Sequence, residues 1–137
     1  MYSRSMYQDR DTTTRTSAEK ILAIVQRECG LIQSSVDVGC GVGTFLSVLQ
    51  ENGVPVIRGI DGPWVDKDLL EIDVFEFIED NLENPRSLGR KYDLAICLEV
   101  AEHLPLSSAD TIVNFLVELS DLVLFSAAIP GQGVKDT

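Results

Sequence analysis

The pattern of apolar and polar positions divides this chain of 137 residues into segments of two kinds. Short apolar runs bounded by Gly, Pro, Asn or Asp are typical of buried strands, whereas apolar residues that recur every three or four positions are typical of a helix face. Strands are predicted at residues 35–38, 54–60, 69–72, 92–98 and 122–127. Helices are predicted at residues 17–29, 44–51, 74–81 and 107–120.

Strands that alternate with helices in this way predict parallel βαβ units. The expected fold is therefore α/β, a doubly wound and mainly parallel sheet in a three-layer sandwich. The run at 92–98 is almost continuously apolar, as expected of a central strand covered on both faces. Residues 1–16 are polar and lack a period, so they are predicted to be a loose arm before a single domain at 17–137.

Charge and cysteine usage narrow the class of protein. The two signs balance over residues 1–60, so the formal net charge of −11 falls on residues 61–137. Such a field repels phosphate backbones and argues against nucleic acid as a partner. Three widely spaced cysteines without a paired motif fit a reduced, cytoplasmic setting. No signal-peptide pattern and no long apolar run appears, so no membrane partner is expected.

The segment with the clearest chemistry joins the first predicted strand to the next helix. It contains Asp37 followed by glycines at 39, 41 and 43. Glycines allow backbone N–H groups to approach a ligand, and the helix that follows adds the positive end of its dipole. The glycine order does not match the G-x-G-x-x-G/A fingerprint of dinucleotide-binding loops. This segment therefore predicts a nucleotide-type cofactor site of another kind.

The D-x-G-x-G-x-G string resembles the loop of class I S-adenosylmethionine-dependent methyltransferases. The resemblance implies a Rossmann-like fold, S-adenosylmethionine as cofactor, and glycines that surround its methionine part. Asp37 would orient the loop and face the cofactor's amino group. The cofactor-binding residues it implies are Asp37, Gly39, Cys40, Gly41, Gly43, Asp61, Gly62, Trp64, Asp73, Val74, Leu98 and Glu99.

Acidic residues at the ends of the next two predicted strands extend this interpretation. A carboxylate such as Asp61 can accept both hydroxyls of a ribose, although an Asp before Gly62 also suits an ordinary turn. Trp64 can cover an adenine or pack against a neighbouring helix. In similar methyltransferases an acid at the position of Asp73 accepts the adenine amine, and the next N–H, here that of Val74, contacts the ring.

The fourth predicted strand leads into Leu98-Glu99-Val100-Ala101-Glu102-His103-Leu104, which resembles the corresponding motif of many small-molecule methyltransferases. Glu99 would lie beside the methionine end of the cofactor, and His103 would border the acceptor pocket. As the only imidazole, His103 is the candidate catalytic base, although a histidine at a helix start also serves in capping or packing.

The same string also resembles the metal ligands of small-RNA 2′-O-methyltransferases. Glu99, Glu102 and His103 would begin such a site. The chain has no second histidine to complete it, and its charge is wrong for RNA. We therefore predict no metal.

The resemblance covers residues 17–131 and ends with the fifth strand. Family members usually continue with a helix and an antiparallel strand pair, so the chain is expected to be C-terminally short, as a truncated or natural short form. Its fifth strand would then be an exposed sheet edge, able to pair with a second copy in a homodimer or to be covered by the N-terminal arm.

Three functions are compatible with these patterns to different degrees. The first is methyl transfer from S-adenosylmethionine to a small-molecule acceptor, in which alignment of the reacting atoms supplies most of the acceleration. The second is a cofactor-binding fold or fragment without transfer activity that serves as an interaction module. The third, a nicotinamide-dependent oxidoreductase, is disfavoured by the glycine spacing.

Overall fold

The structure is a computed structural model that describes residues 4–98, 100 and 103–126, with side chains from Thr13 onward. The described strands form one parallel sheet in the order β3-β2-β1-β4-β5. Their bounds are β1 Ser34–Val38, β2 Val56–Asp61, β3 Phe77–Glu79, β4 Leu94–Leu98 and β5 Val123–Ser126. The order runs outward from β1 in both directions, as the predicted doubly wound topology requires.

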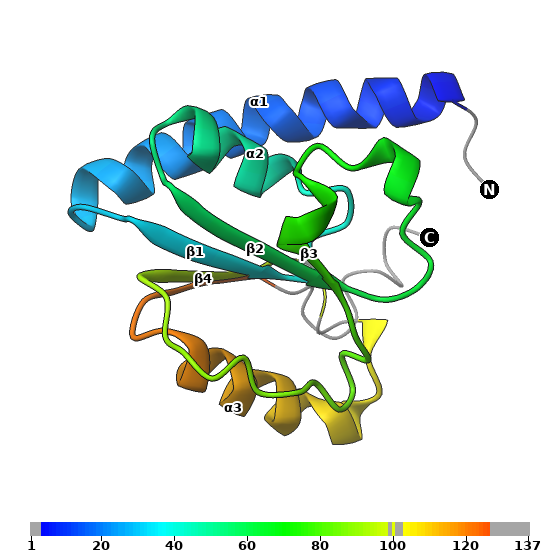
Figure 1. The fold of residues 1–137 in the computed structure, drawn as a ribbon, viewed down its shortest axis with the longest axis vertical. Coiled ribbons are helices and arrows are strands. Elements are labelled where there is room, and N and C mark those ends of the chain that lie inside the picture. Colours follow the sequence, from blue (N-terminus) through cyan, green and yellow to red (C-terminus); the bar gives the residue numbers. More distant parts are fainter. Residues whose placement is uncertain (1–3, 99, 101–102, 127–137) are drawn as a thin grey trace, which may run out of the picture.

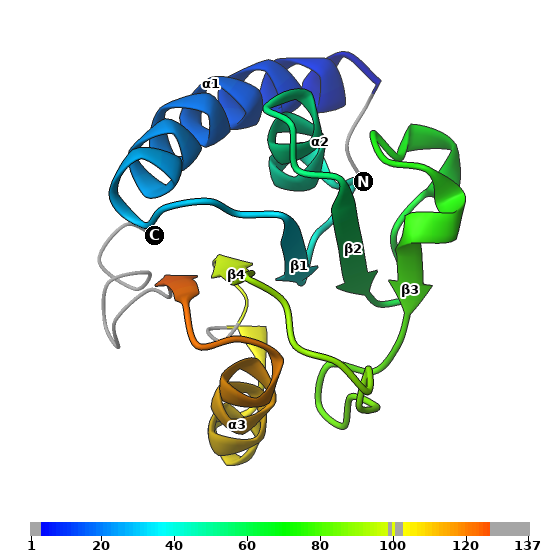
Figure 2. The same ribbon diagram turned by 60° about the vertical axis from the view of Figure 1, so that its left-hand side comes forward.

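Helices cover both faces of this sheet. Helices α1 (Arg4–Glu28) and α2 (Thr44–Glu51) lie together on one face, and α3 (Ala109–Leu119) lies on the other (Figures 1 and 2). The predicted three-layer α/β sandwich is therefore confirmed. The connections on either side of β3 carry no α-helix in the described residues; the first contains only the 3-10 turns η1 (Lys67–Leu69) and η2 (Val74–Glu76).

Alternate residues of the strands supply two separate hydrophobic layers. Leu94 and Ile96 of β4 pack with the helices α1 and α2, whereas Ala95 and Cys97 of the same strand pack with α3. Successive strand side chains point to opposite faces of the sheet, so a strand that is apolar throughout fills both layers. This explains why the sequence of β4 is almost continuously apolar.

The first helix corrects the prediction of a loose N-terminal arm. Helix α1 begins at Arg4, not near residue 17, and includes most of the predicted arm. No Gly or Pro interrupts residues 1–28, so a helix nucleated by the packing of Ala18 and Leu22 can extend toward the N-terminus. Arg15 ties this part of the helix to α2 through Glu51.

The third strand also differs from its prediction. The predicted strand at 69–72 and the predicted helix at 74–81 are both absent, and β3 instead spans Phe77–Glu79. The misleading signal was an apparent helical stripe that began at Phe75, a side chain that is 88% exposed. Pairing of β3 with β2, from Gly59 with Phe77 to Asp61 with Glu79, overrides that local pattern.

Strand β5 lies at one edge of the sheet in the described part of the chain and pairs with β4. Its Phe125 side chain is exposed. Pairing of this edge with a second copy stays a prediction. Among the described residues, no helix has the length and apolarity needed to span a membrane.

Candidate functional site

The glycine loop, residues 39–43, joins β1 to α2 at the carboxyl edge of the sheet. Two of its positions require glycine for different reasons. Gly43 caps α2 in the left-handed region, with φ of 89°, and a Cβ there would come within 3.0 Å of Ile72. Gly39, with φ of 84°, faces Val100 so closely that a Cβ would collide with it. A Cβ on Gly41 would meet no atom of the described residues within 4 Å, so the loop is open toward them on that side.

Backbone hydrogen bonds bind this loop to the end of β2. The N–H groups of Gly39 and Cys40 both donate to the carbonyl oxygen of Ile60, at 2.7 and 3.1 Å. The N–H of Gly41 donates to Oδ2 of Asp61 at 2.8 Å. The first two strand ends, which were predicted separately from the sequence, therefore form one continuous site.

Asp61 is the polar centre of that site. Its residue is only 6% exposed, and its Oδ1 accepts a second hydrogen bond from the N–H of Gly62 at 2.8 Å. The indole of Trp64 also lies beside the carboxylate and acts to lower its pKa. Burial raises the pKa of Asp61, and the N–H groups of Gly41 and Gly62 and the indole of Trp64 oppose that rise without cancelling it.

Asp37 places a second carboxylate within the electrostatic reach of Asp61. It lies in the middle of the sheet, paired with Gly59 of β2 and Ile96 of β4, and is 5% exposed. Burial is the main cause that raises the pKa of Asp37 to about 8, and the negative charge of Asp61 adds to it. The site thus holds two acidic groups that favour a cation or a hydrogen-bond donor as ligand.

Trp64 is neither packed into a helix nor buried. The residue is 71% exposed, and its ring lies directly over Gly62, where a Cβ would collide with it. Of the two alternatives for this side chain, packing against the neighbouring helix is not what the structure shows. Its indole remains at the edge of the site, in contact with Asp61.

The structure corrects the placement of Asp73 and Val74 at a strand end. Asp73 caps η2, before β3 begins: its side chain accepts from the N–H of Phe75, and its own N–H donates to Glu76. Both Asp73 and Val74 are therefore at the start of the third strand and not at its carboxyl edge. Their predicted contacts with a cofactor are not supported by that position.

The acidic residue that does follow β3 is Asp80, which was not predicted from the sequence. Its N–H donates to the carbonyl oxygen of Asp61 at 3.0 Å, so it lies next to the centre of the site. Burial acts to raise the pKa of Asp80, but hydrogen bonds from Arg86 and Asn81 outweigh it and hold the pKa below its usual value. The apolar pair Phe77-Ile78 just before two acidic residues was the available signal.

The residues after β4 are only partly described. Leu98 is half-buried at the end of the strand, and Cys40 is half-buried in the glycine loop. His103 is exposed, and its N–H donates to the carbonyl oxygen of Val100 at 2.9 Å. Glu99 and Glu102 lie outside the described residues. Among the residues that are described, no group of three His, Cys, Asp or Glu side chains could hold a metal ion.

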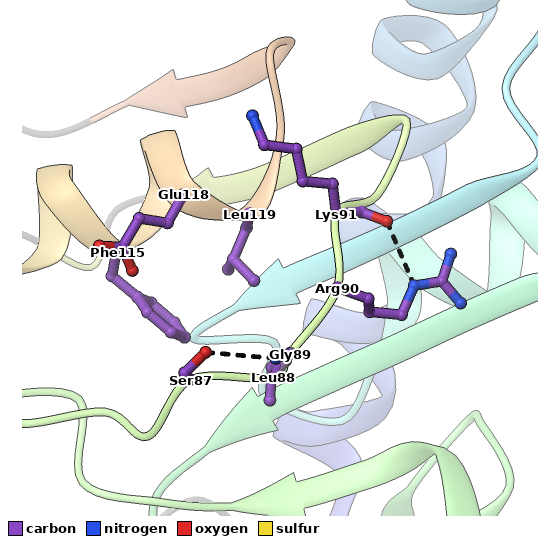
Figure 3. Close-up of a pocket in the computed structure, with 8 residues that line it drawn as sticks. All are labelled: Ser87, Leu88, Gly89, Arg90, Lys91, Phe115, Glu118 and Leu119. Atoms are coloured by element: carbon purple, nitrogen blue, oxygen red, sulfur yellow. Dashed lines mark hydrogen bonds between the residues drawn. The ribbon is translucent and has the colours of Figure 1, made fainter.

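A small pocket lies elsewhere, beside the C-terminal end of α3 and before β4 (Figure 3). Its volume is about 210 Å³, and its wall is formed by residues 87–91 with Phe115, Glu118 and Leu119. Tyr92 donates its N–H to the carbonyl oxygen of Leu119, which places the pocket at the amino edge of the strands. It is therefore separate from the carboxyl-edge site.

Comparisons with known proteins agree with this geometry. Residues 10–121 match the family model described as "Methyltransferase domain". A search of curated protein sequences found no significant match.

Solved structures share the fold at low sequence identity. Over 96% of this chain and 60% of the other, SAM-bound CalS10, an amino pentose methyltransferase from Micromonospora echinaspora, superposes with a TM-score of 0.78 and 15% identity. The methyltransferase domain of bacterial CtHen1 superposes with a TM-score of 0.64 and 19% identity, over 82% of this chain and 65% of the other. Magnesium protoporphyrin IX methyltransferase from Synechocystis, with bound SAH, superposes with a TM-score of 0.67 and 23% identity, over 99% of this chain and 65% of the other.

The chain thus spans about three fifths of the length of these structures. The matched family model extends from α1 to residue 121, two residues before β5, and it includes the glycine loop and the ends of β1, β2 and β4. The chain belongs to the methyltransferase-domain family, with the Rossmann-like fold of class I S-adenosylmethionine-dependent methyltransferases.

Proposed function

We propose that this protein binds S-adenosylmethionine at the carboxyl edge of its sheet and transfers the methyl group to a small-molecule acceptor. The observation that carries the proposal is the contact between Gly41 and Asp61, which joins the glycine loop to a buried carboxylate. A glycine loop at a helix N-terminus suits the carboxylate end of the ligand, and an acid at the next strand end suits a ribose.

The donor set fits the cofactor. The open side of Gly41 leaves room for a ligand against the described part of the loop, and the carboxyl groups of Asp37 and Asp61 lie beside it. A cationic ligand would lower the pKa of Asp37 from its value of about 8, so Asp37 would ionise when the ligand binds. Bound S-adenosylmethionine would supply an activated methyl group. The chain's own residues would hold and orient the cofactor for an in-line transfer.

Asp61 has acceptor positions left for a ribose. A carboxylate offers about four, and two are used by the N–H groups of Gly41 and Gly62. Two positions therefore remain for two ribose hydroxyls. Trp64 is exposed beside them, and we propose that its indole moves to make room for the ligand. We propose Asp80, after β3, for the adenine-side position that the resemblance implied for Asp73.

Charge narrows the acceptor class. The excess of negative charge over residues 61–137 disfavours nucleic acid as the acceptor. The small-molecule acceptor is proposed because CalS10 is named as an amino pentose methyltransferase and the Synechocystis enzyme as a magnesium protoporphyrin IX methyltransferase. His103, exposed after the end of β4, is the proposed base that borders the acceptor.

Titration with S-adenosylhomocysteine tests the cofactor site, and the fluorescence of the single tryptophan reports the movement of Trp64. Asp61→Asn should weaken binding about tenfold to a hundredfold, because the lost hydrogen bonds involve a charged acceptor. The control is Asp68→Asn, which changes an exposed aspartate in the connection that follows β2 and should bind as the wild type does.

No binding heat at about 1 mM ligand would overturn the proposal. A dissociation constant of about 1 mM corresponds to a binding free energy of only about −4 kcal/mol. Transfer is tested separately by release of S-adenosylhomocysteine in the presence of amino sugars, phenols or RNA. Binding without release from any small acceptor would favour the alternative, a cofactor-binding module without transfer activity.

A further inference from the structure

Two residues outside the glycine loop hold its end against α2. The N–H of Glu71 donates to the carbonyl oxygen of Val42 at 2.7 Å, and the hydroxyl of Thr44 donates to Oε2 of Glu71 at 3.0 Å. The next side chain, Ile72, packs against Gly43. Residues 42–44, which form the turn into α2, are therefore fixed from the side of the connection that follows β2.

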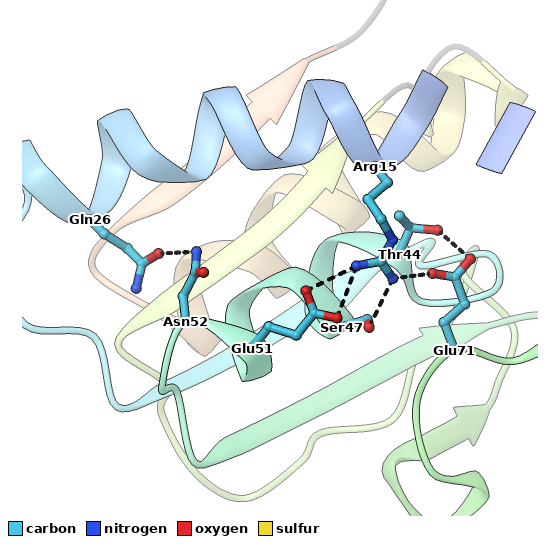
Figure 4. Close-up of polar contacts among 7 residues, drawn as sticks. All are labelled: Arg15, Gln26, Thr44, Ser47, Glu51, Asn52 and Glu71. Carbon is cyan, nitrogen blue, oxygen red and sulfur yellow. Dashed lines mark hydrogen bonds and ion pairs between the residues drawn. The ribbon is translucent and has the colours of Figure 1, made fainter. Parts of the chain in front are cut away.

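Arg15 of α1 in turn holds Glu71 (Figure 4). Its Nη2 lies 2.6 Å from Oε1 of Glu71 and 3.1 Å from the hydroxyl of Ser47, while its Nη1 lies 3.1 Å from both carboxylate oxygens of Glu51. The side chains of Arg15 and Glu71 are 28% and 18% exposed, whereas that of Glu51 is 60% exposed. The contact with Glu71 is therefore the shielded one, and partly buried pairs are screened less by salt.

We propose that Arg15 is a positioning residue for the glycine loop, so that α1 sets cofactor affinity through Glu71 without touching the cofactor. This inference rests on the proposed function for its ligand. The path is short and continuous: the guanidinium orients the Glu71 carboxylate, the carboxylate fixes the Thr44 hydroxyl, and Glu71 fixes Val42 through its N–H. The planar fork of an arginine holds Ser47, Glu51 and Glu71 from two separate nitrogens, a geometry that a lysine ammonium does not reproduce.

Because Arg15 and Glu71 carry opposite charges, their removal should weaken ligand binding to different degrees. Removal of Arg15 leaves the carboxylate of Glu71 mostly buried beside the loop, where it would repel the carboxylate end of the ligand. Removal of the charge on Glu71 leaves no such anion. Arg15→Ala should therefore weaken binding more than Glu71→Gln does, and the double variant should recover part of the loss of Arg15→Ala.

The experiment compares Arg15→Ala, Arg15→Lys and Glu71→Gln with Glu51→Gln, a control that removes the exposed ion pair of the same arginine. Hydrogen exchange reports the backbone of residues 41–47, and the amides of β4 report global stability. Arg15→Ala should speed exchange over residues 41–47 about tenfold and leave β4 unchanged. Affinity for S-adenosylhomocysteine should fall about fivefold to twentyfold, with Arg15→Lys intermediate and Glu51→Gln within twofold of the wild type.

Exchange over residues 41–47 that is equal in Arg15→Ala and Glu51→Gln would overturn the inference. An equal rise over β4 would also overturn it, because it would show a general loss of stability. The exchange measurement needs no ligand, so it decides the role of Arg15 even if the wild type binds no S-adenosylhomocysteine. That last result would contradict the proposed function alone.

Discussion

The two connections on either side of β2 are built in opposite ways. The glycine loop before α2 is bound to the neighbouring strand, through the carbonyl of Ile60 and the carboxylate of Asp61. The connection from Gly62 to Glu76 is built from local turns, capped by Asp66 and Asp73. The first is fixed by the sheet and tolerates little change, whereas the second buries Ile72 but leaves Trp64 and Phe75 exposed.

The largest expected effect comes from adding a methyl group in the fixed connection. Gly43→Ala must adopt φ near 89° and press on Ile72, so it should cost about 2–4 kcal/mol of unfolding free energy. Gly62→Ala meets the Trp64 ring, which is exposed and can rotate away, so it should cost less than about 1 kcal/mol. Urea unfolding of both variants measures the difference. Equal costs would contradict the proposed contrast in rigidity.

A second effect depends on pH and concerns Asp37. The pKa of its carboxyl is about 8 in the folded chain against an ordinary value of 3.8, so folding favours the protonated form. The stability it contributes is complete below pH 4 and is lost as pH rises to about 8. Asp37→Asn imitates the protonated form. It should raise the melting temperature relative to the wild type by an amount that grows from pH 4 to 8, to several degrees.

The same variant should weaken binding of S-adenosylhomocysteine, because the asparagine cannot ionise beside the ligand's amino group. A melting difference that is constant with pH would show that Asp37 is ionised in the folded chain. Calorimetry in two buffers of different ionisation heat would also detect the proton that Asp37 releases when the ligand binds to the wild type.

The smallest expected effect separates Asp73 from Asp80. Asp73→Ala should cost about 1 kcal/mol through loss of the η2 cap and leave affinity for S-adenosylhomocysteine unchanged. Asp80→Asn should weaken affinity severalfold, because Asp80 lies beside Asp61 at the carboxyl edge. Thermal melting of both variants measures the change in stability, and calorimetry measures their affinity for S-adenosylhomocysteine. Weaker binding by Asp73→Ala would show that Asp73 contacts the ligand and would contradict the assignment of the adenine side to Asp80.

Local signals were enough to predict the glycine loop and the elements around it. Helix α2 has the predicted bounds, Thr44–Glu51, and β1 and β4 differ from prediction by one or two residues at their starts. Glycines, an apolar run and a helical stripe are all contained in short windows of sequence. The parallel, doubly wound sheet was predictable because strands that alternate with helices leave few topologies.

Contacts between distant residues could not be predicted in this way. Arg15 and Glu71 are 56 residues apart, and no pattern in either segment indicates the other. Strand β3 has only three residues, fewer than a periodic signal needs, and its pairing with β2 decides where it begins. The strand end predicted at Asp73 was wrong for that reason, whereas the end of the longer strand at Asp61 was predicted correctly.

The shortness of β3 has a consequence for how the molecule opens. This strand is at the edge of the described sheet, pairs with β2 alone, and has connections without an α-helix on either side. Elements with few backbone partners detach at a lower free energy than the central strands do. Thermal fluctuations should therefore release β3 first and uncover the ends of β1 and β2 from that side. A ligand that enters or leaves there need not disturb β4 and α3, so exchange of the bound molecule is separated from unfolding of the core.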